Sequence, residues 1–370
     1  MGRKRFKRIG EGSFFGDFVY REIIPQDHFL VKLKELVPWE RFTQQLIKCY
    51  RGGAEVGRPP YDPAVILRML LVAYLYDLSE RQVEEMVNYH LPMKYFVGLA
   101  VNERAPDHST LTAFKGRVER NGHVAAFQQM LGEIIAVAGE RGIEFGRIQV
   151  LDSVHTVADV NTQKDESRQD KEGKGPRDAS ARWGAKHTRR VKNSKGQTIK
   201  QTEYFYGYKA HVSLNSETGL ITSVHVTPGN RYDGHEMPGL LEKDLAQGMP
   251  VEIVTADRGY DDSGNHTLLE SLGIQSAIRL NRYRTEKKDA SKEVWVALME
   301  SEGYQEGLKE RYKVERKFGE AKLGHGLRRS RYVGLVKYAI QVILTAMALN
   351  LKRMVRLLTG IPFKGRAVAA

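Results

Sequence analysis

Apolar positions recur with the spacing of a helix over most of residues 28–122. Asp62 precedes Pro63 and a strongly apolar run, which is the pattern of an N-cap followed by proline in the first helical turn. Ser79 opens a second, short amphipathic helix with a capping-box arrangement. A later helix begins in the region Asp107–Ser109. The pattern therefore predicts a series of helices in this half of the chain.

A long helix is predicted over residues 124–142, and together these segments define a helical domain over residues 28–143. Short helices joined by tight polar turns are typical of a helix-turn-helix-like DNA-binding module. A plain helical domain that helps two copies to dimerise would have the same pattern, so both interpretations stay open.

From residue 147 onward, apolar and polar residues alternate as they do in strands. Residues 147–160 are rich in β-branched residues and predict the first strand. Two further alternating segments, joined by the turn SETG, predict a hairpin. After them, short apolar strands alternate with helices up to the C-terminal helix. The predicted elements are strands at 203–215, 219–229, 251–257 and 275–281, and helices at 235–246, 263–273, 311–329 and 335–358.

This order of elements predicts an α/β fold with a ribonuclease H-like catalytic domain, in which helices cover a five-stranded mixed sheet. The catalytic domain is expected over residues 144–358, preceded by the all-α DNA-binding or dimerisation domain. Residues 161–202 have almost no apolar content, so we expect a flexible basic loop within the catalytic domain. Residues 1–27 are expected to be a basic flexible arm and residues 359–370 a tail.

The net charge of the chain indicates which kind of partner it binds. The formal net charge is +13, while the apolar content of 41% and the charged content of 28% are ordinary for a globular protein. A large positive excess favours polyanionic partners, and nucleic acid is the commonest of them. A basic surface without a function is the alternative.

Several other classes of protein are excluded by the sequence. The single cysteine, Cys49, rules out an internal disulfide framework and a Cys-rich zinc site, and it favours a reducing, cytoplasmic location. The glycine-rich residues 10–16 lack the Lys-Ser/Thr of a phosphate loop, so we expect no nucleotide cofactor. Lys352 and Arg353 interrupt the apolar run of residues 338–358, which predicts a buried helix and no membrane span.

Two aspartates are the first candidates for catalysis. Asp152 lies among apolar residues of the first strand, where a carboxylate needs a compensating metal or cation unless it faces solvent. Asp257 ends a later apolar strand, at the carboxyl edge where ligands of α/β sheets bind, although an aspartate there also commonly begins a turn. If the two strands are neighbours, the carboxylates converge and call for a divalent cation, Mg²⁺ or Mn²⁺ as a substitute. A third carboxylate from a helix would complete a two-metal site for phosphoryl transfer.

The helix predicted at 311–329 offers two glutamates, Glu315 and Glu320. Arg311 and Lys322 are four and seven residues from Glu315, so helical geometry places all three on one face. Glu320 points roughly 140° away from Glu315. Glu315 is therefore the better candidate for a metal ligand. It lies beside an apolar stripe that would pack on the sheet, made of Val314, Phe318 and Ala321.

These residues resemble a known family. The chain is similar to DDE transposases of bacterial insertion sequences, close to insertion-sequence family 5 and the related family 4. The matching motifs are Asp152 in the first strand, DRGY at 257–260, and the signature Y-x-x-R-x-x-x-E-x-x-x-x-x-x-K over residues 308–322. Leu308 stands where that signature has tyrosine. The segments GRPPYDP, YGYKAH, TPGN and GLRRSRYVGL are also similar, so the resemblance spans roughly residues 50–350.

The resemblance implies an activity and a partner. It implies that Asp152, Asp257 and Glu315 hold Mg²⁺, that Arg311 and Lys322 contact DNA near the scissile phosphate, and that a homodimer assembles on DNA. Lys209 and His211 are further candidates near the site, with ordinary polar strand residues as the alternative.

Four further residues have expected roles outside this set. Asp233 is expected to be a loop or N-cap residue, because a helix follows it. In the expected basic loop, Trp183 could stack on a base while Arg189 and Arg190 follow the DNA backbone.

The sequence thus predicts a bacterial, nucleoid-associated transposase. It would bind terminal inverted repeats, cleave their 3′ ends by Mg²⁺-dependent hydrolysis and join them to target DNA. Two other functions stay open: a metal-dependent nuclease without strand transfer, and a non-catalytic DNA-binding regulator.

Overall fold

The computed structural model describes residues 6–7, 14–50, 59–122, 124–192, 198–286, 288 and 290–364. The chain divides into two compact units, residues 1–143 with 343–370, and residues 144–342. The C-terminal segment from residue 343 thus groups with the N-terminal unit, whereas the sequence analysis assigned it up to residue 358 to the catalytic domain. Each unit is described separately below.

The described part of the first unit up to residue 140 forms helices only. They are α1 (Phe14–Ile23), α2 (Phe29–Leu36), α3 (Trp39–Ile47), α4 (Pro63–Leu75), α5 (Glu80–Tyr89), α6 (Leu91–Val97), α7 (His108–Arg120) and α8 (Val124–Glu140). The side chains of Asp62, Ser79 and Asp107 cap α4, α5 and α7 by accepting hydrogen bonds from backbone amides, as the sequence pattern predicts.

Helix α1 lies within residues 1–27, which the sequence analysis took as a flexible arm; for the described residues this expectation is wrong. Tyr20 and Ile24 are buried against Val31 of α2, together with Leu91 and Tyr95 of α6. The Tyr20 hydroxyl also donates a hydrogen bond of 2.8 Å to the carbonyl oxygen of Leu99. Tertiary burial of these apolar side chains stabilises a short helix whose local sequence alone is uninformative.

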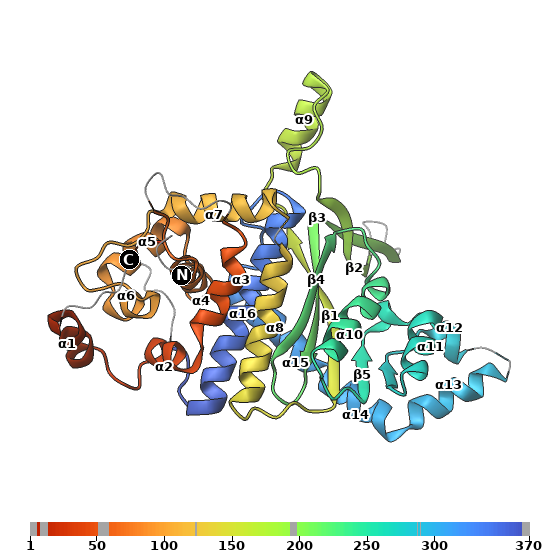
Figure 1. Cartoon of the computed structure of the whole chain (residues 1–370). Helices are drawn as coiled ribbons and strands as arrows, with labels where there is room; N and C mark the ends of the chain where they lie inside the picture. Colours follow the sequence, from red (N-terminus) through yellow and green to blue (C-terminus); the bar gives the residue numbers. More distant parts are fainter. Residues whose placement is uncertain are drawn as a thin grey trace. The chain divides into compact units, whose positions relative to one another are not determined.

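The second unit contains a six-stranded mixed sheet, which confirms the expected mixed α/β class (Figure 1). Its strands are β1 (Ile148–Val157), β2 (Arg182–Lys192), β3 (Thr198–Asn215), β4 (Ile221–Pro228), β5 (Ile253–Ala256) and β6 (Gln275–Ile278). The five expected strands follow the order β4-β3-β1-β5-β6, with β4, β3 and β1 antiparallel and β1, β5 and β6 parallel. These are the strand order and directions of the ribonuclease H-like arrangement inferred from the sequence.

The sixth strand corrects the expectation of a loop at 161–202, because that segment contains helix α9 (Thr162–Glu172), β2 and the start of β3. Strand β2 pairs with the first half of the long strand β3. Backbone hydrogen bonds between the two strands therefore stabilise this segment, although it contains few apolar residues to bury. Asp178 anchors the segment: it is fully buried and accepts hydrogen bonds of 2.6 Å from the Tyr208 hydroxyl. Figure 1 shows α9 standing away from the sheet.

Helices pack on both faces of the sheet. Helices α10 (Met237–Ala246) and α11 (Ser263–Ser271) lie against a cluster that includes Leu151 and Val254. On the other face, α13 (Ser291–Glu300) and α14 (Glu302–Glu310) pack against Ile148, Ile253 and Ala277. Successive strand residues point to opposite faces, so Leu151 faces α10 while Asp152 faces the side of α14. The short helix α12 (Arg282–Thr285) and the longer helix α15 (Tyr312–Gly324) also belong to this unit.

The last helix, α16 (Leu335–Thr359), is long and apolar enough to cross a membrane. The interruption by Lys352 and Arg353 therefore does not by itself make the helix too short to span a membrane. Of its most apolar window, however, 78% is buried inside the protein, as in the core helix of a globular protein. At its start, the ring of Tyr338 stacks on that of Tyr208 with centroids 4.7 Å apart, and its hydroxyl donates a hydrogen bond of 2.9 Å to Thr156.

Candidate active site

The register between β1 and β5 brings Asp152 and Asp257 together. Val150 pairs with Thr255 in the parallel ladder, and each aspartate comes two residues later. Neighbouring strands are about 4.8 Å apart, so the two carboxylates share one edge of the sheet. The side chain of Asp152 is only 15% exposed. Burial and, as the second cause, repulsion from Asp257 together raise the pKa of Asp152 to about 7.

Arg311 lies between Asp152 and Glu315. It stands at the junction of α14 and α15, and its Nη2 atom is 3.9 Å from Oδ2 of Asp152 and 3.9 Å from Oε1 of Glu315. The arginine side chain is 15% exposed and that of Glu315 is 64% exposed. Arg311 thus links the exposed Glu315 to Asp152. Glu320 forms a separate ion pair of 3.4 Å with Lys317.

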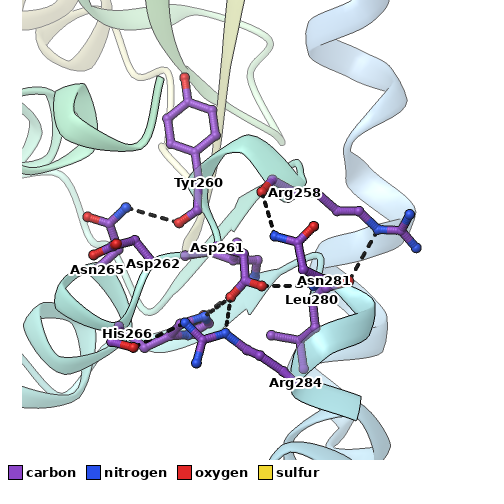
Figure 2. Close-up of polar contacts among 12 residues, drawn as sticks. Arg258, Tyr260, Asp261, Asp262, Asn265, His266, Leu280, Asn281 and Arg284 are labelled. Atoms are coloured by element: carbon purple, nitrogen blue, oxygen red, sulfur yellow. Dashed lines mark hydrogen bonds and ion pairs between the residues drawn. The ribbon is translucent and has the colours of Figure 1, made fainter. Parts of the chain in front are cut away.

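Two side chains hold the turn that follows Asp257, that of Asp257 itself and that of Asn265. Oδ1 of Asp257 accepts a hydrogen bond of 2.7 Å from the amide of Gly259, in the 3-10 helix η3 (Arg258–Tyr260). The side-chain amide of Asn265 donates to the carbonyl oxygens of Tyr260 and Gly234, both at 3.0 Å (Figure 2 draws the first contact). This asparagine therefore joins the turn after Asp257 to the segment that carries Asp233.

Asp261 is the centre of a buried network behind this turn (Figure 2). Its carboxylate accepts hydrogen bonds from Arg284 Nε at 2.5 Å, His266 Nε2 at 3.0 Å and the amide of Asn281 at 2.8 Å. The side chain of Asn281 in turn donates to the carbonyl oxygen of Arg258 at 3.1 Å. The network fixes the turn that presents Asp257 against the loop after β6. Asp261 is not among the residues expected from the sequence, although it directly follows the DRGY motif.

Asp233, expected from the sequence to be a loop or N-cap residue, lies in the connection between β4 and α10 and is not an N-cap. It begins the 3-10 helix η2 (Asp233–Glu236), whose N-cap residue is Tyr232. Its Oδ1 atom accepts a hydrogen bond of 2.8 Å from Lys209 Nζ and is 3.8 Å from Nδ1 of the buried His211. Lys209 and His211 are therefore both directed at Asp233. Its proximity to the site arises from the loop after β4, which a strand pattern does not reveal.

The other expected DNA contacts come from β2 and α15. The ring of Trp183, 52% exposed, lies 5.4 Å from that of Tyr206 and borders an open cavity beside β1 and β3. Burial lowers the pKa of Lys322, and the nearby cations Lys186 and Arg328 lower it further. Arg189 and Arg190 belong to β2, but their side chains lie outside the described part of the structure.

A different group of metal-ligand types lies in the first unit: Glu84, Asp107 and His108. The carboxylates of Glu84 and Asp107 already accept hydrogen bonds within the protein. Glu84 accepts hydrogen bonds from the backbone amide and Nδ1 of His108, and Asp107 caps α7. We interpret this group as the capping structure of a helix.

Asp152 and Asp257 provide hard oxygen ligands with adjacent negative charges, which is the donor set that Mg²⁺ and Mn²⁺ bind. The raised pKa of Asp152 reflects its burial first and the adjacent charge of Asp257 second. The residues thus fit a divalent cation at the carboxyl edge of the sheet.

Comparison with known families agrees with this arrangement. Residues 159–351 match the family model described as Transposase DDE domain, and residues 18–117 match the Transposase domain DUF772. The first match covers more than half of the chain, and the protein belongs to the DDE transposase family. The matched region contains Asp257 and Glu315 and begins seven residues after Asp152.

Among solved structures, the chain is similar to a piggyBac transposase in a synaptic complex with hairpin DNA. The two are 10% identical, with 91% of this chain and 78% of that chain covered and a TM-score of 0.35. It is also similar to the Mos1 transposase in a paired-end complex with the left transposon end, with 12% identity, coverage of 80% and 87%, and a TM-score of 0.20. Similarities at this level add nothing to the family assignment, which rests on the sequence match.

Proposed function

We propose that this protein is the transposase of a bacterial insertion sequence of family 5, related to family 4. It binds the terminal inverted repeats, cleaves their 3′ ends by metal-dependent hydrolysis and joins the ends to target DNA. The observation that carries the proposal is the in-register pair Asp152 and Asp257. Arg311 lies 3.9 Å from both Asp152 and Glu315 and so connects this pair to the glutamate. The protein would act in the cytoplasm, associated with the nucleoid.

In this proposal, Asp152, Asp257 and Glu315 hold Mg²⁺, or Mn²⁺ as a substitute. When bound, the metal activates the attacking water or 3′-hydroxyl and stabilises the leaving oxygen. The chain itself holds the reacting phosphate in line. Arg311 is suited to this task because a guanidinium offers several fixed donors to phosphate oxygens. The guanidinium of Arg311, which lies between Asp152 and Glu315 in the free protein, would be available to a DNA phosphate if a divalent cation served as the counter-charge of these carboxylates.

DNA binding is supported by the net charge of +13 and by the clustering of cations along the second unit. Lys322 of α15, Lys186 of β2 and Arg328 come from separate segments yet lie close enough to lower the pKa of Lys322. Such a cluster favours a phosphate group, which would remove the mutual repulsion. Trp183 would stack on a base, and the helices of the first unit would bind the inverted repeats. A homodimer would hold the two transposon ends during joining.

The test compares Glu315→Gln with the matched variant Glu320→Gln on the same helix. Cleavage of labelled terminal-repeat DNA in Mg²⁺ is expected to fall at least about a hundredfold in Glu315→Gln, because a metal ligand is lost, and to change less than about threefold in Glu320→Gln. Pre-cleaved ends and a supercoiled target then test strand transfer. Cleavage without joined product would favour the nuclease, while undiminished activity of Glu315→Gln would refute the assigned ligand set.

A further inference from the structure

The segment after β4 brings a fourth carboxylate, Asp233, to the proposed metal centre. A Cβ atom built on Gly259 would lie 2.9 Å from Oδ1 of Asp257 and 3.7 Å from Oδ2 of Asp233. Both carboxylates therefore border the same point of the turn. Asn265 holds the two segments together through its hydrogen bonds to the carbonyl oxygens of Gly234 and Tyr260. The hydrogen bonds of Asn265 thus fix Asp233 close to Asp257.

The two oxygens of Asp233 have different surroundings. Oδ1 accepts the hydrogen bond from Lys209, whose Nζ atom also donates to the carbonyl oxygen of Arg231 at 2.9 Å. Oδ2 is the oxygen that lies near Gly259, on the side of Asp257. The lysine therefore orients the carboxylate and leaves one oxygen directed toward the site, as partners that orient metal ligands commonly do.

Two buried polar atoms beside Asp233 and Asp257 lack hydrogen-bond partners among the described residues, which indicates that the site binds an ion or water. The hydroxyl of Tyr260 is buried without a hydrogen-bond partner among the described residues, and it lies near the charges of Asp152, Asp233 and Asp257. Nδ1 of His211, a side chain with no exposed surface, likewise has no hydrogen-bond partner in the described part of the chain and is 3.8 Å from Asp233 Oδ1. Buried donors and acceptors in proteins are normally satisfied. An ordered hydrated cation among the carboxylates would supply the missing partners.

We propose that Asp233 is a fourth carboxylate of the metal centre, which binds a divalent cation together with Asp257 and is oriented by Lys209. The inference rests on the proposed function, because it assigns one more residue to the same site. It adds an acidic residue from the loop after β4 to the three expected from β1, β5 and α15. The loss of its charge should weaken cation binding even in the absence of DNA.

The experiment measures Mn²⁺ binding to the full chain by titration calorimetry without DNA, for the wild type and three variants. Asp233→Asn keeps an oxygen for Lys209 and is expected to weaken Mn²⁺ binding about tenfold or more, as is Asp257→Asn. Asp262→Asn is the matched control. It removes the same charge nearby, but Asp262 is exposed and caps α11 through the amide of Gly264, so we expect less than about a twofold change.

A second pair of variants tests direct contact between the side chain and the ion. A thiolate at position 233 should favour the softer Cd²⁺, so Asp233→Cys should raise the affinity for Cd²⁺ relative to Mn²⁺ about tenfold more than the control Asp262→Cys. Equal Mn²⁺ affinity of Asp233→Asn and the wild type would overturn this inference. A chain that binds Mn²⁺ as expected in every variant but never cleaves transposon ends would overturn the proposed function alone.

Discussion

The buried carboxylate of Asp261 gives the most demanding stability prediction. Its side chain has no exposed surface, and the guanidinium of Arg284, 6% exposed, lies 2.5 Å away. Asp261→Ala would leave this arginine buried without its counter-charge, and the loss of one partner of a buried ion pair costs about 3–5 kcal/mol. Asp261→Asn would keep an oxygen for the amide of Asn281 and is expected to cost about 1.5–3 kcal/mol. Natural domains have only about 5–15 kcal/mol of stability, so the first variant should be severely destabilised.

Urea unfolding, followed by fluorescence at pH 7, measures the difference. The control is Asp159→Asn, which removes a carboxylate from an exposed ion pair with Arg329 at 2.9 Å and should change the free energy of unfolding by less than about 1 kcal/mol. Although burial raises the pKa of Asp261, the hydrogen bonds from His266, Asn281 and Arg284 outweigh it and leave that pKa below its usual range. The contribution of Asp261 is therefore complete above about pH 4 and is lost as the pH falls through the lowered value. If Asp261→Ala lay within 1 kcal/mol of the control, the network would not stabilise the turn.

Two further changes test the packing and the charge of the second unit. The pKa of Asp152 is raised to about 7 in the folded protein, whereas the unfolded chain releases this proton near pH 4. Without metal, the free energy of unfolding therefore falls as the pH rises from about 4 to about 7. Asp152→Asn should therefore stabilise the metal-free protein more at pH 8 than at pH 5 in urea unfolding, and an equal effect at both would contradict this. Gly307→Ala would place a Cβ 2.5 Å from that of Ala277 and should destabilise by about 1–3 kcal/mol in thermal unfolding, whereas Gly319→Ala, with open space around it, should stabilise by up to about 1 kcal/mol. Similar melting temperatures for the two alanine variants would refute the close contact of α14 with the sheet.

Much of the second unit could be predicted because its strands carry their pattern locally. Five strands follow from alternation and from short apolar runs, whereas their order and the register of Val150 with Thr255, which aligns the two aspartates, come from the structure. Strand β2 could not be predicted in this way. Its residues bury little apolar surface, and what stabilises them is pairing with β3, a contact that composition does not record. Helix α1 was missed for a related reason, since its packing partners lie on α2 and α6.

The candidate site shows the same limit. Asp152, Asp257 and Glu315 have recognisable neighbours in the sequence, whereas Asp233 stands in a loop where an aspartate is usually a turn or capping residue. Only the path of that loop across the end of the sheet places it beside Gly259. Asp261 has no independent signal either, because its partners Arg284 and His266 come from elements separated along the chain.

The arrangement of β1, β5 and α15 also has a consequence for protein synthesis. A chain leaves the ribosome N-terminus first at about 5–20 residues per second, and the strand with Asp152 emerges well before the helix with Glu315. The parallel partner β5 must also be present before Asp257 can take its place beside Asp152. A nascent chain, or a fragment that ends before α15, thus contains the N-terminal helices but only part of the acidic site. The acidic site of the proposed transposase would therefore be completed late, after the N-terminal helices have been made.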